Sequence, residues 1–222
     1  MDKKKIAILF LGKQDDQYVQ AALDFCCQNF TDVTAHLGKW GDKLPEDLKS
    51  WQGDYVISYL SRWVVPEYLL NHTRIASFNF HPAPPEYPGI GCNNFALYED
   101  AKEYGVTCHH MAPRVDTGGI IAVKRFPMFP TDNVASLLAR TYAYQIVLFY
   151  EILSLIAEGK PLPSSEEKWT RKPFTRVEFN RLFEITPDMP KEEIARRVRA
   201  ISYGPWQPKI ELEGFVFELK SD

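Results

Sequence analysis

Residues 75–82 have the sequence IASFNFHP, a mostly apolar run that contains one Asn and ends at a His followed by a proline. Short apolar runs between chain breakers are typical of strands buried in a parallel sheet. We therefore predict a strand over 75–80 that places His81 at its carboxyl end.

Five further runs of this kind, on both sides of the first, predict five more strands. They cover residues 6–11, 33–37, 55–60, 106–111 and 120–126. Apolar residues at helical spacing lie between or after them, in 18–25, 93–100 and 133–158. Strands that alternate with helices indicate an α/β fold, with a mostly parallel sheet and helices on both faces.

The segment 161–165, Pro-Leu-Pro-Ser-Ser, predicts a domain boundary. Residues 1–163 then form the main domain, and 164–222 form a small C-terminal region. Within that region we predict a helix over Lys191–Ile201 and a β-hairpin with strands at 210–212 and 215–219. A piece this small is not stable alone, so we expect it to pack on the main domain, on a second subunit, or on both.

The composition is that of an ordinary globular protein: 222 residues, 45% hydrophobic, 25% charged, with a net charge of −3. A protein with this slight acidic excess is not expected to bind nucleic acid across a broad surface. The four cysteines form no C-x-x-C pair, which argues against a zinc or redox site and for reduced thiols. The N-terminal residues do not have the pattern of a signal peptide, and no apolar run is long enough to span a bilayer. We therefore expect a cytoplasmic protein without membrane contact.

Two polar clusters follow predicted strands. Asn79 and His81 are two residues apart, so their side chains share one face of an extended strand. Asp116 lies in the turn after the strand 106–111, and ligands of such sheets gather at the carboxyl ends of strands. Acyl transfer to an amine needs a donor for the oxyanion and a group that manages the proton. By spacing alone, the favoured explanation is structural: a buried histidine with local hydrogen bonds and an Asp that caps a turn.

Four motifs extend this pattern along the chain. They are Phe78–Pro82 (FNFHP), Tyr87–Gly89 (YPG), Gly105–His109 (GVTCH) and Val115–Ile121 (VDTGGII). In this order they resemble the signature of the formyltransferase family, over roughly residues 78–121. The resemblance implies a Rossmann-like formyltransferase domain that uses N10-formyltetrahydrofolate as co-substrate.

The resemblance also implies roles for individual residues. The family's catalytic Asn, His and Asp fall on Asn79, His81 and Asp116. In the family's scheme Asn79 and protonated His81 stabilise the oxyanion, while Asp116 positions His81 and helps to move protons through water. The pterin is held by backbone groups of 60–65 and 111–116, which gives Leu60, Met111, Val115 and Asp116 as cofactor-binding residues.

No metal is expected, because no carboxylate or cysteine lies at metal-ligand spacing from a histidine. His109 and His110 are adjacent on a predicted strand and must face opposite sides of it. We expect one to point toward the centre of the sheet and the other toward a covering helix.

The acceptor amine distinguishes subgroups of the family. Methionyl-tRNA formyltransferases have an additional basic C-terminal barrel, for which this chain is too short. Glycinamide ribonucleotide formyltransferases have a Gly-Ser-Asn loop where this chain has Gly12–Asp16, sequence GKQDD. The chain most resembles sugar N-formyltransferases, which implies a nucleotide-linked amino sugar such as dTDP-4-amino-4,6-dideoxyglucose, or a 3-amino isomer, made for O-antigen or other surface polysaccharide.

A formyltetrahydrofolate hydrolase and a non-catalytic binding module remain alternatives. For the sugar nucleotide, the candidate contacts are Lys13, Asn94, Tyr203 and Trp206, with Trp169 as a further aromatic side chain. Tyr203 and Trp206 could equally anchor the hairpin to the main domain. In sugar N-formyltransferases the hairpin region commonly helps to form a homodimer, which is the assembly we expect here.

Overall fold

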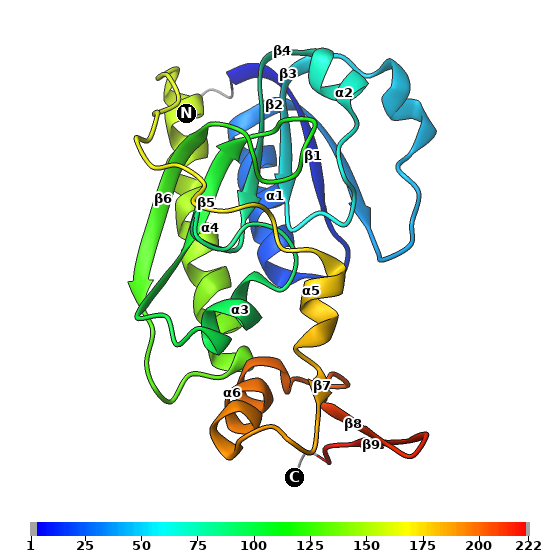
Figure 1. The fold of residues 1–222 in the computed structure, drawn as a ribbon. Coiled ribbons are helices and arrows are strands. Elements are labelled where there is room, and N and C mark those ends of the chain that lie inside the picture. The colour runs from blue at the N-terminus through cyan, green and yellow to red at the C-terminus, as the bar shows by residue number, and fades with distance from the viewer. Residues whose placement is uncertain (1–3, 221–222) are drawn as a thin grey trace.

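A six-stranded sheet forms the centre of the molecule (Figure 1). The computed structural model describes residues 4–220. The strands are β1 (Lys4–Lys13), β2 (Phe30–Gly38), β3 (Gly53–Tyr59), β4 (Thr73–His81), β5 (Glu103–His110) and β6 (Ile120–Pro127). Their order in the sheet is β2-β1-β3-β4-β5-β6. Every strand predicted for the main domain is present, and each is longer than or shifted by a few residues from its predicted range.

The strand directions decide where the ends of the strands lie. β2, β1, β3 and β4 are parallel neighbours. β5 runs antiparallel to β4 on one side and to β6 on the other. β5 is therefore the strand that runs against the other five, and the sheet is mostly parallel as predicted.

Two long helices cover one face of the sheet. They are α1 (Gln17–Asn29) and α4 (Val134–Glu158). The ring of Phe149 on α4 lies 5.0 Å from Phe80 and 5.1 Å from Tyr59, and all three are almost fully buried. Burial of each such ring contributes ~2–3 kcal/mol relative to exposure, so this aromatic layer holds α4 against β3 and β4.

Two short helices cover part of the other face. They are the 3-10 helix η1 (Glu46–Ser50) and α2 (Glu67–Asn71), neither of which the sequence pattern predicts. Leu48 and Leu69 pack there against buried side chains of β1 and β3. The prediction of helices on both faces is thus confirmed. None of the helices within residues 4–220 is long and apolar enough to cross a membrane.

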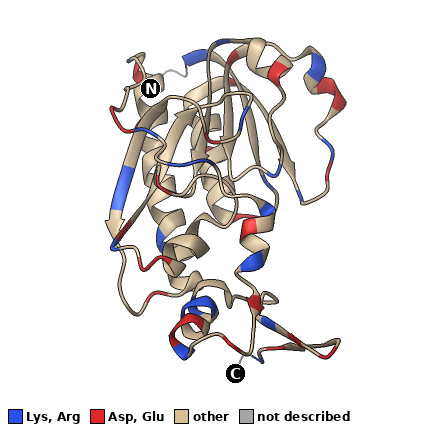
Figure 2. Ribbon diagram, in the orientation of Figure 1, with Lys and Arg blue, Asp and Glu red and all other residues tan. Residues whose placement is uncertain are grey.

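Most of the C-terminal elements lie beyond one end of the sheet, at the bottom of Figure 1, and α5 (Arg176–Arg181) lies above them. The elements after α5 are β7 (Glu184–Ile185), α6 (Lys191–Ile201), β8 (Lys209–Leu212) and β9 (Phe215–Glu218), and α6 packs against α3 (Cys92–Tyr98). The helix and the hairpin are both where the sequence predicts them. β7 adds a parallel strand to the hairpin and makes a small sheet of three strands. Figure 2 shows that α6 carries charges of both signs, among them the ion pair of Glu193 and Arg197 at 2.6 Å.

Candidate active site

The carboxyl end of β4 presents two polar side chains on one face. Asn79 is half-buried and His81 is 5% exposed. Across the antiparallel pair, Asn79 lies opposite His109 of β5, and the Asn79 Nδ2 and His109 Nε2 atoms are 3.1 Å apart. Residues that face each other on neighbouring strands share one side of the sheet. His109 is therefore part of the same cluster, with 2% of its surface exposed.

Asp116 reaches this cluster from the loop between β5 and β6. The sequence argument placed it at the carboxyl end of a parallel strand, and this premise is wrong because β5 runs antiparallel to β4. The loop instead folds back over the sheet. Asp116 adopts a left-handed backbone conformation with φ 50°. At Gly118 an added Cβ would lie 1.8 Å from the His110 carbonyl oxygen, so only glycine fits there.

The carboxylate of Asp116 bridges two imidazoles. Its Oδ2 lies 3.3 Å from His81 Nδ1 and accepts a 2.8 Å hydrogen bond from the Gly89 N–H. Its Oδ1 lies 3.3 Å from His109 Nε2. Burial raises the pKa of Asp116, but the facing His81 and His109 and the Gly89 N–H outweigh this, and the pKa falls from 3.8 to about 2. Asp116 is therefore ionised at neutral pH.

Both ring nitrogens of His81 face hydrogen-bond acceptors. Nε2 lies 2.9 Å from the Tyr87 carbonyl oxygen, and Nδ1 faces the Asp116 carboxylate. A neutral imidazole has one N–H and can satisfy one of these acceptors, whereas an imidazolium satisfies both.

His109 is also connected on both sides. Its Nδ1 lies 2.8 Å from the His110 carbonyl oxygen, which requires an N–H at that position. Nε2 lies 3.1 Å from Asn79 Nδ2 and 3.3 Å from Asp116 Oδ1, so it accepts from the Asn79 amide when it carries no hydrogen and donates to Asp116 when it carries one. The Asn79 amide has a second N–H that remains for a ligand. Sequence reasoning treated His109 as a structural residue. The feature that connects His109 to the site is its position opposite Asn79. This position depends on the antiparallel pairing of β4 and β5, which the sequence does not show. His109 and His110 do face opposite sides, since His109 is buried and His110 is exposed.

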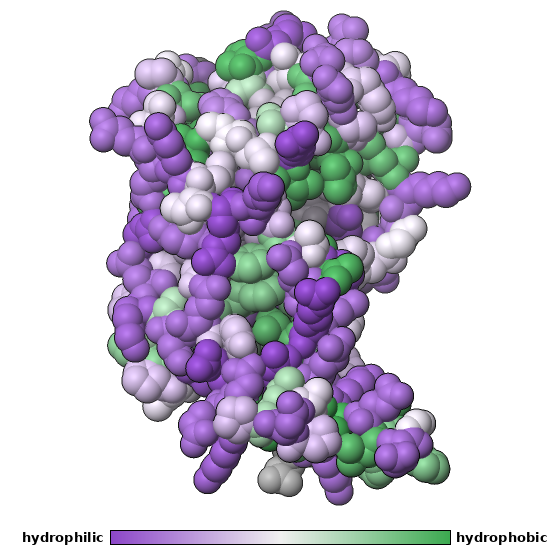
Figure 3. Space-filling model, in the orientation of Figure 1, coloured by the Kyte–Doolittle hydropathy of each residue, from purple (hydrophilic) through white to green (hydrophobic). Residues whose placement is uncertain are grey.

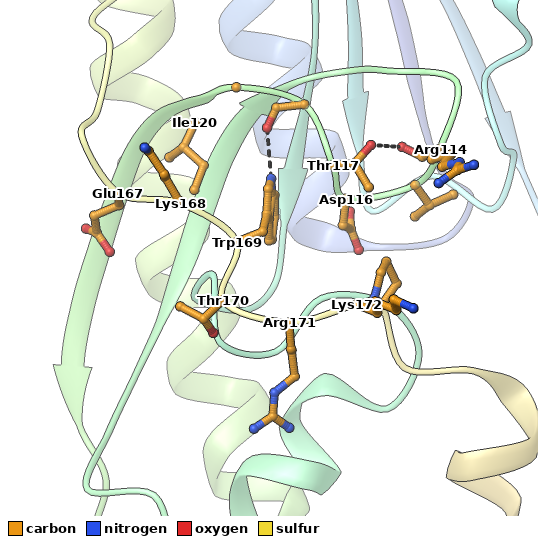
Figure 4. Close-up of a pocket in the computed structure, with 14 residues that line it drawn as sticks. Arg114, Asp116, Thr117, Ile120, Glu167, Lys168, Trp169, Thr170, Arg171 and Lys172 are labelled. Atoms are coloured by element: carbon orange, nitrogen blue, oxygen red, sulfur yellow. Dashed lines mark hydrogen bonds between the residues drawn. The ribbon is translucent and has the colours of Figure 1, made fainter.

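A covering segment (residues 164–175) crosses the sheet over this cluster, and Figure 4 shows part of it. The Trp169 indole Nε1 donates a 2.8 Å hydrogen bond to the Gly118 carbonyl oxygen. The Trp169 ring lies edge-on to His81 at 5.8 Å and to His109 at 5.0 Å between centroids. Near the end of the segment, the Phe174 N–H donates a 2.9 Å hydrogen bond to the Pro88 carbonyl oxygen. Trp169 thus shields the two histidines from water on this side.

The covering segment separates two hollows. On one side an open groove of about 840 Å³ runs between Arg114–Ile120 and Glu167–Pro173. On the other side a cavity of about 580 Å³ contains Asn79, His81, His109 and Asp116. Figure 3 shows apolar side chains gathered in the hollow centre of this face. Several apolar and aromatic residues line the cavity wall, among them Leu60, Trp63, Val65 and Met111. A flat heteroaromatic ligand suits such a wall.

The residues implied for cofactor binding are all at this cavity. Leu60, Met111, Val115 and Asp116 line it. So do the rest of 60–65 and most of 111–116. Leu60 has a left-handed backbone with φ 52°, which turns the chain as it leaves β3. That these residues bind the co-substrate stays a prediction.

The residues implied for the sugar nucleotide are not brought together. Lys13 lines the cavity, where its Nζ pairs with Asp16 at 2.8 Å. Asn94 is buried, and its Nδ2 donates to the Ala200 carbonyl oxygen at 2.7 Å, which ties α3 to α6. Tyr203 and Trp206 bond to each other through their backbones. Within the described part of the chain, none of these last three residues lines the cavity.

No group of three or more His, Cys, Asp or Glu side chains within residues 4–220 is arranged to hold a metal ion. The polar cluster at β4 contains two histidines but a single carboxylate, and that carboxylate is engaged by both imidazoles.

The lowered pKa of Asp116 predicts acid sensitivity. Because the folded-state pKa is about 2 and the ordinary value is 3.8, the folded state keeps Asp116 ionised at pH values where the unfolded chain binds a proton. The carboxylate therefore contributes about 2 kcal/mol above pH 4, and this is lost as the pH falls toward 2. Urea unfolding of the wild type and Asp116→Asn at pH 7 and pH 3 measures it. A difference in stability between the two proteins that is the same at both pH values would contradict the assignment.

Comparison with known proteins identifies a matching family and related proteins. A family model described as Formyl transferase matches residues 13–152. The methionyl-tRNA formyltransferase of Geobacillus thermodenitrificans is 29% identical over 164 residues, which are 72% of this chain and 50% of that protein. The chain spans about half the length of the curated relatives it matches.

Solved structures resemble the chain over nearly its whole length. A 4-N formyltransferase from Francisella tularensis has a TM-score of 0.79 at 16% identity, covering 99% of this chain and 98% of the other. The N-formyltransferase of Helicobacter canadensis, solved with folinic acid and dTDP-3-aminofucose, has a TM-score of 0.71 at 18% identity, covering 94% and 85%. At this level of identity the likeness shows the fold, which is the Rossmann-like formyltransferase fold predicted from the sequence.

Proposed function

Because the chain belongs to the formyl transferase family, we propose that it transfers a formyl group from N10-formyltetrahydrofolate to the amine of a nucleotide-linked amino sugar. The observation that supports this most is the cluster of Asn79, His81 and Asp116, which lines a cavity with an apolar wall. The wall takes the pterin, through Leu60, Met111 and Val115, and the cluster faces the formyl group. Folinic acid, a formylated tetrahydrofolate, is bound to the Helicobacter canadensis neighbour.

In the proposed reaction the acceptor amine attacks the formyl carbon. A new C–N bond forms, and the carbonyl oxygen becomes an oxyanion. The free N–H of Asn79 donates to this oxyanion, and the His81 imidazolium supplies positive charge, its Nε2–H exchanging the Tyr87 carbonyl for the oxyanion. The bond from carbon to N10 then breaks, and tetrahydrofolate leaves with the proton that the amine gives up.

Asp116 acts on His81 in this scheme. Its pKa of about 2 makes it a weak base at neutral pH, so its main effect is to keep His81 charged and oriented. Together with water it guides the proton from the amine to N10. Trp169 excludes bulk water from the two histidines, which strengthens the charge interactions.

The charge of the cavity supports an anionic acceptor. Lys13, Arg62, Arg114 and Arg176 line it, and Asp116 is the only acidic residue among the described lining residues. Within the described part of the chain the three arginines form no ion pair. A diphosphate matches such a set of donors. We take dTDP-4-amino-4,6-dideoxyglucose, made for bacterial surface polysaccharide, as the first acceptor to test, and its 3-amino isomers as the next.

A second candidate acceptor is Met-tRNA. The observation that favours it is the sequence similarity to methionyl-tRNA formyltransferases, which extends over 164 residues for one relative and 145 for another. Both candidates place an amine at the same cluster. They differ in the anionic group that would meet the basic residues of the cavity: the diphosphate of a nucleotide sugar, or the phosphates of the tRNA.

A panel of acceptors distinguishes these candidates. The protein is incubated with N10-formyltetrahydrofolate and, separately, with dTDP-4-amino- and dTDP-3-amino-dideoxyhexoses, UDP-4-amino-arabinose, glycinamide ribonucleotide and Met-tRNA, and products are detected by mass. We expect one nucleotide sugar to gain the mass of a formyl group. Formylation of Met-tRNA alone would refute the sugar assignment, and formate release without an acceptor would indicate a hydrolase.

We also propose that the chain forms a homodimer through the C-terminal hairpin. β8 and β9 expose Leu212, Phe215, Val216 and Phe217, with 69% of Phe215 and 54% of Phe217 accessible. Figure 3 shows apolar side chains at the lower right, where Figure 1 places β8 and β9. A monomer seldom leaves a contiguous patch of this kind in water.

The variant Phe215→Glu/Phe217→Glu should therefore convert a dimer into a monomer. Sedimentation velocity measures this, with Val177→Glu, at an exposed valine on α5, as the control that stays dimeric. A wild type that sediments as a monomer at all concentrations would contradict the proposed dimer.

A further inference from the structure

Trp40 is unusually exposed for a tryptophan, with 69% of its surface accessible. It stands on a turn after β2 whose backbone is fixed by three hydrogen bonds. The Lys39 N–H donates to Asp42 Oδ2 at 2.7 Å, the Asp42 N–H to the Lys39 carbonyl at 3.3 Å, and Trp63 Nε1 to the Asp42 carbonyl at 2.9 Å. The exposed indole is thus held in a defined place.

The turn is further anchored to the sheet beneath it. The Trp63 ring packs so closely on Gly38, at the end of β2, that an added Cβ would lie 2.2 Å from it. Gly41 has φ 89°, a conformation that favours glycine and sharpens the turn. Gly38, Gly41 and the half-buried Trp63 therefore fix the turn that exposes Trp40 to solvent.

One face of Trp40 is already occupied by a cation. The Arg62 guanidinium carbon lies 4.9 Å from the centre of the indole. No carboxylate of the described residues pairs with Arg62. A guanidinium over an indole makes a flat, positively charged surface, which is the kind of surface on which nucleobases stack.

Trp40 and Arg62 line the same cavity as the catalytic cluster. Lys13 and Arg176 line it as well. The cavity therefore contains the polar cluster at His81, the aromatic and cationic pair of Trp40 and Arg62, and further cations. A nucleotide-linked amino sugar has a group to match each of these: an amine, a base and a diphosphate.

We propose that Trp40, backed by Arg62, is the platform on which the base of the acceptor stacks, while the cations of the cavity wall bind the diphosphate. This rests on the proposed function, because it assumes a nucleotide acceptor. It replaces Tyr203 and Trp206 as the stacking residues. The Trp206 ring packs against Phe183 at 6.1 Å, in the C-terminal region and outside the cavity lining.

Calorimetric titration of the full chain with dTDP and with pyrophosphate tests the platform without requiring turnover. The variants are Trp40→Ala, Trp40→Phe and, as the matched control, Trp206→Ala. We expect Trp40→Ala to weaken dTDP binding about 10-fold or more, in the range measured for loss of one base-stacking side chain. Its affinity for pyrophosphate should not change, Trp40→Phe should retain most of the dTDP affinity, and Trp206→Ala should bind dTDP like the wild type.

Each other outcome has a distinct meaning. If Trp40→Ala binds dTDP as tightly as the wild type, the platform is elsewhere and the proposal fails, while the formyl transfer proposal stands. If Trp40→Ala weakens dTDP and pyrophosphate equally, its effect is on folding of the turn and the stacking role is refuted. If the wild type binds neither ligand, both the platform and the nucleotide acceptor are refuted. If it binds dTDP through Trp40 but formylates no dTDP-sugar, the platform stands and the proposed reaction fails.

Discussion

Replacement of His81 by Asn is expected to lower kcat for formyl transfer by about 10²- to 10⁴-fold. The His81 ring is held between the Tyr87 carbonyl and the Asp116 carboxylate, and in the proposed reaction it supplies the positive charge beside the oxyanion. Asparagine keeps one N–H donor but carries no charge, so the oxyanion loses its main electrostatic support. Initial rates at saturating co-substrate and acceptor measure the change.

The matched control is His36→Asn. His36 lies on β2, where its Nε2 faces Asp47 at 3.6 Å, and it is not among the residues that line the cavity. We expect its kcat to stay within about twofold of the wild type, as for surface substitutions away from special features. A His81→Asn protein that unfolds at the wild-type temperature and turns over near the wild-type rate would show that His81 has no catalytic role.

The second large effect is expected for Asp116→Asn, with kcat again lower by about 10²- to 10⁴-fold. Asn is the same size as Asp, but it removes the negative charge that both His81 and His109 face. Without this charge the His81 imidazolium is no longer favoured, and an amide N–H can be turned toward a ring nitrogen. The loss should appear in kcat more than in KM, because Asp116 acts on the transition state through His81.

Asp24→Asn on α1 serves as the control for this substitution. Asp24 is exposed and accepts one hydrogen bond from Gln20 on the same helix. If Asp116→Asn raised KM for the acceptor tenfold and left kcat unchanged, Asp116 would be a binding residue, and the role assigned to it in the proposed reaction would be wrong.

The fold was predictable to the extent that its signals are local. The buried strands β1, β3 and β4 are short apolar runs, and α4 and α6 have clear helical spacing, so all of these could be placed. α5 was missed although its signal is readable. Thr175 and Glu178 form a capping box, in which the Glu178 N–H bonds Thr175 Oγ1 at 3.2 Å and the Thr175 N–H bonds Glu178 Oε2 at 2.7 Å. η1 and α2 have five residues each, too few for a periodic pattern.

The site was predictable where the motif is contiguous. Asn79 and His81 follow from the alternation of one strand, and Asp116 came from the family resemblance. The structure brings the three together, but by a loop that folds back from an antiparallel strand. Strand direction depends on pairing between distant segments, and no local pattern reports it. The roles of His109 and Trp169 were missed for the same reason, because each is defined by a contact across the sheet or across the covering segment. Trp40 was likewise unremarkable in the sequence, since exposure and a neighbouring Arg62 appear only once the turn is folded.

The most direct test of the proposed function follows the formyl carbon itself. N10-[¹³C]formyltetrahydrofolate and dTDP-4-amino-4,6-dideoxyglucose are incubated with the protein, with His81→Asn as control, and the label is followed by ¹³C NMR. We predict that the wild type moves the label into a formamide on the sugar and that His81→Asn leaves it on the folate. Label that appears as formate, or that stays on the folate in the wild type for each dTDP-amino sugar offered, would contradict the account.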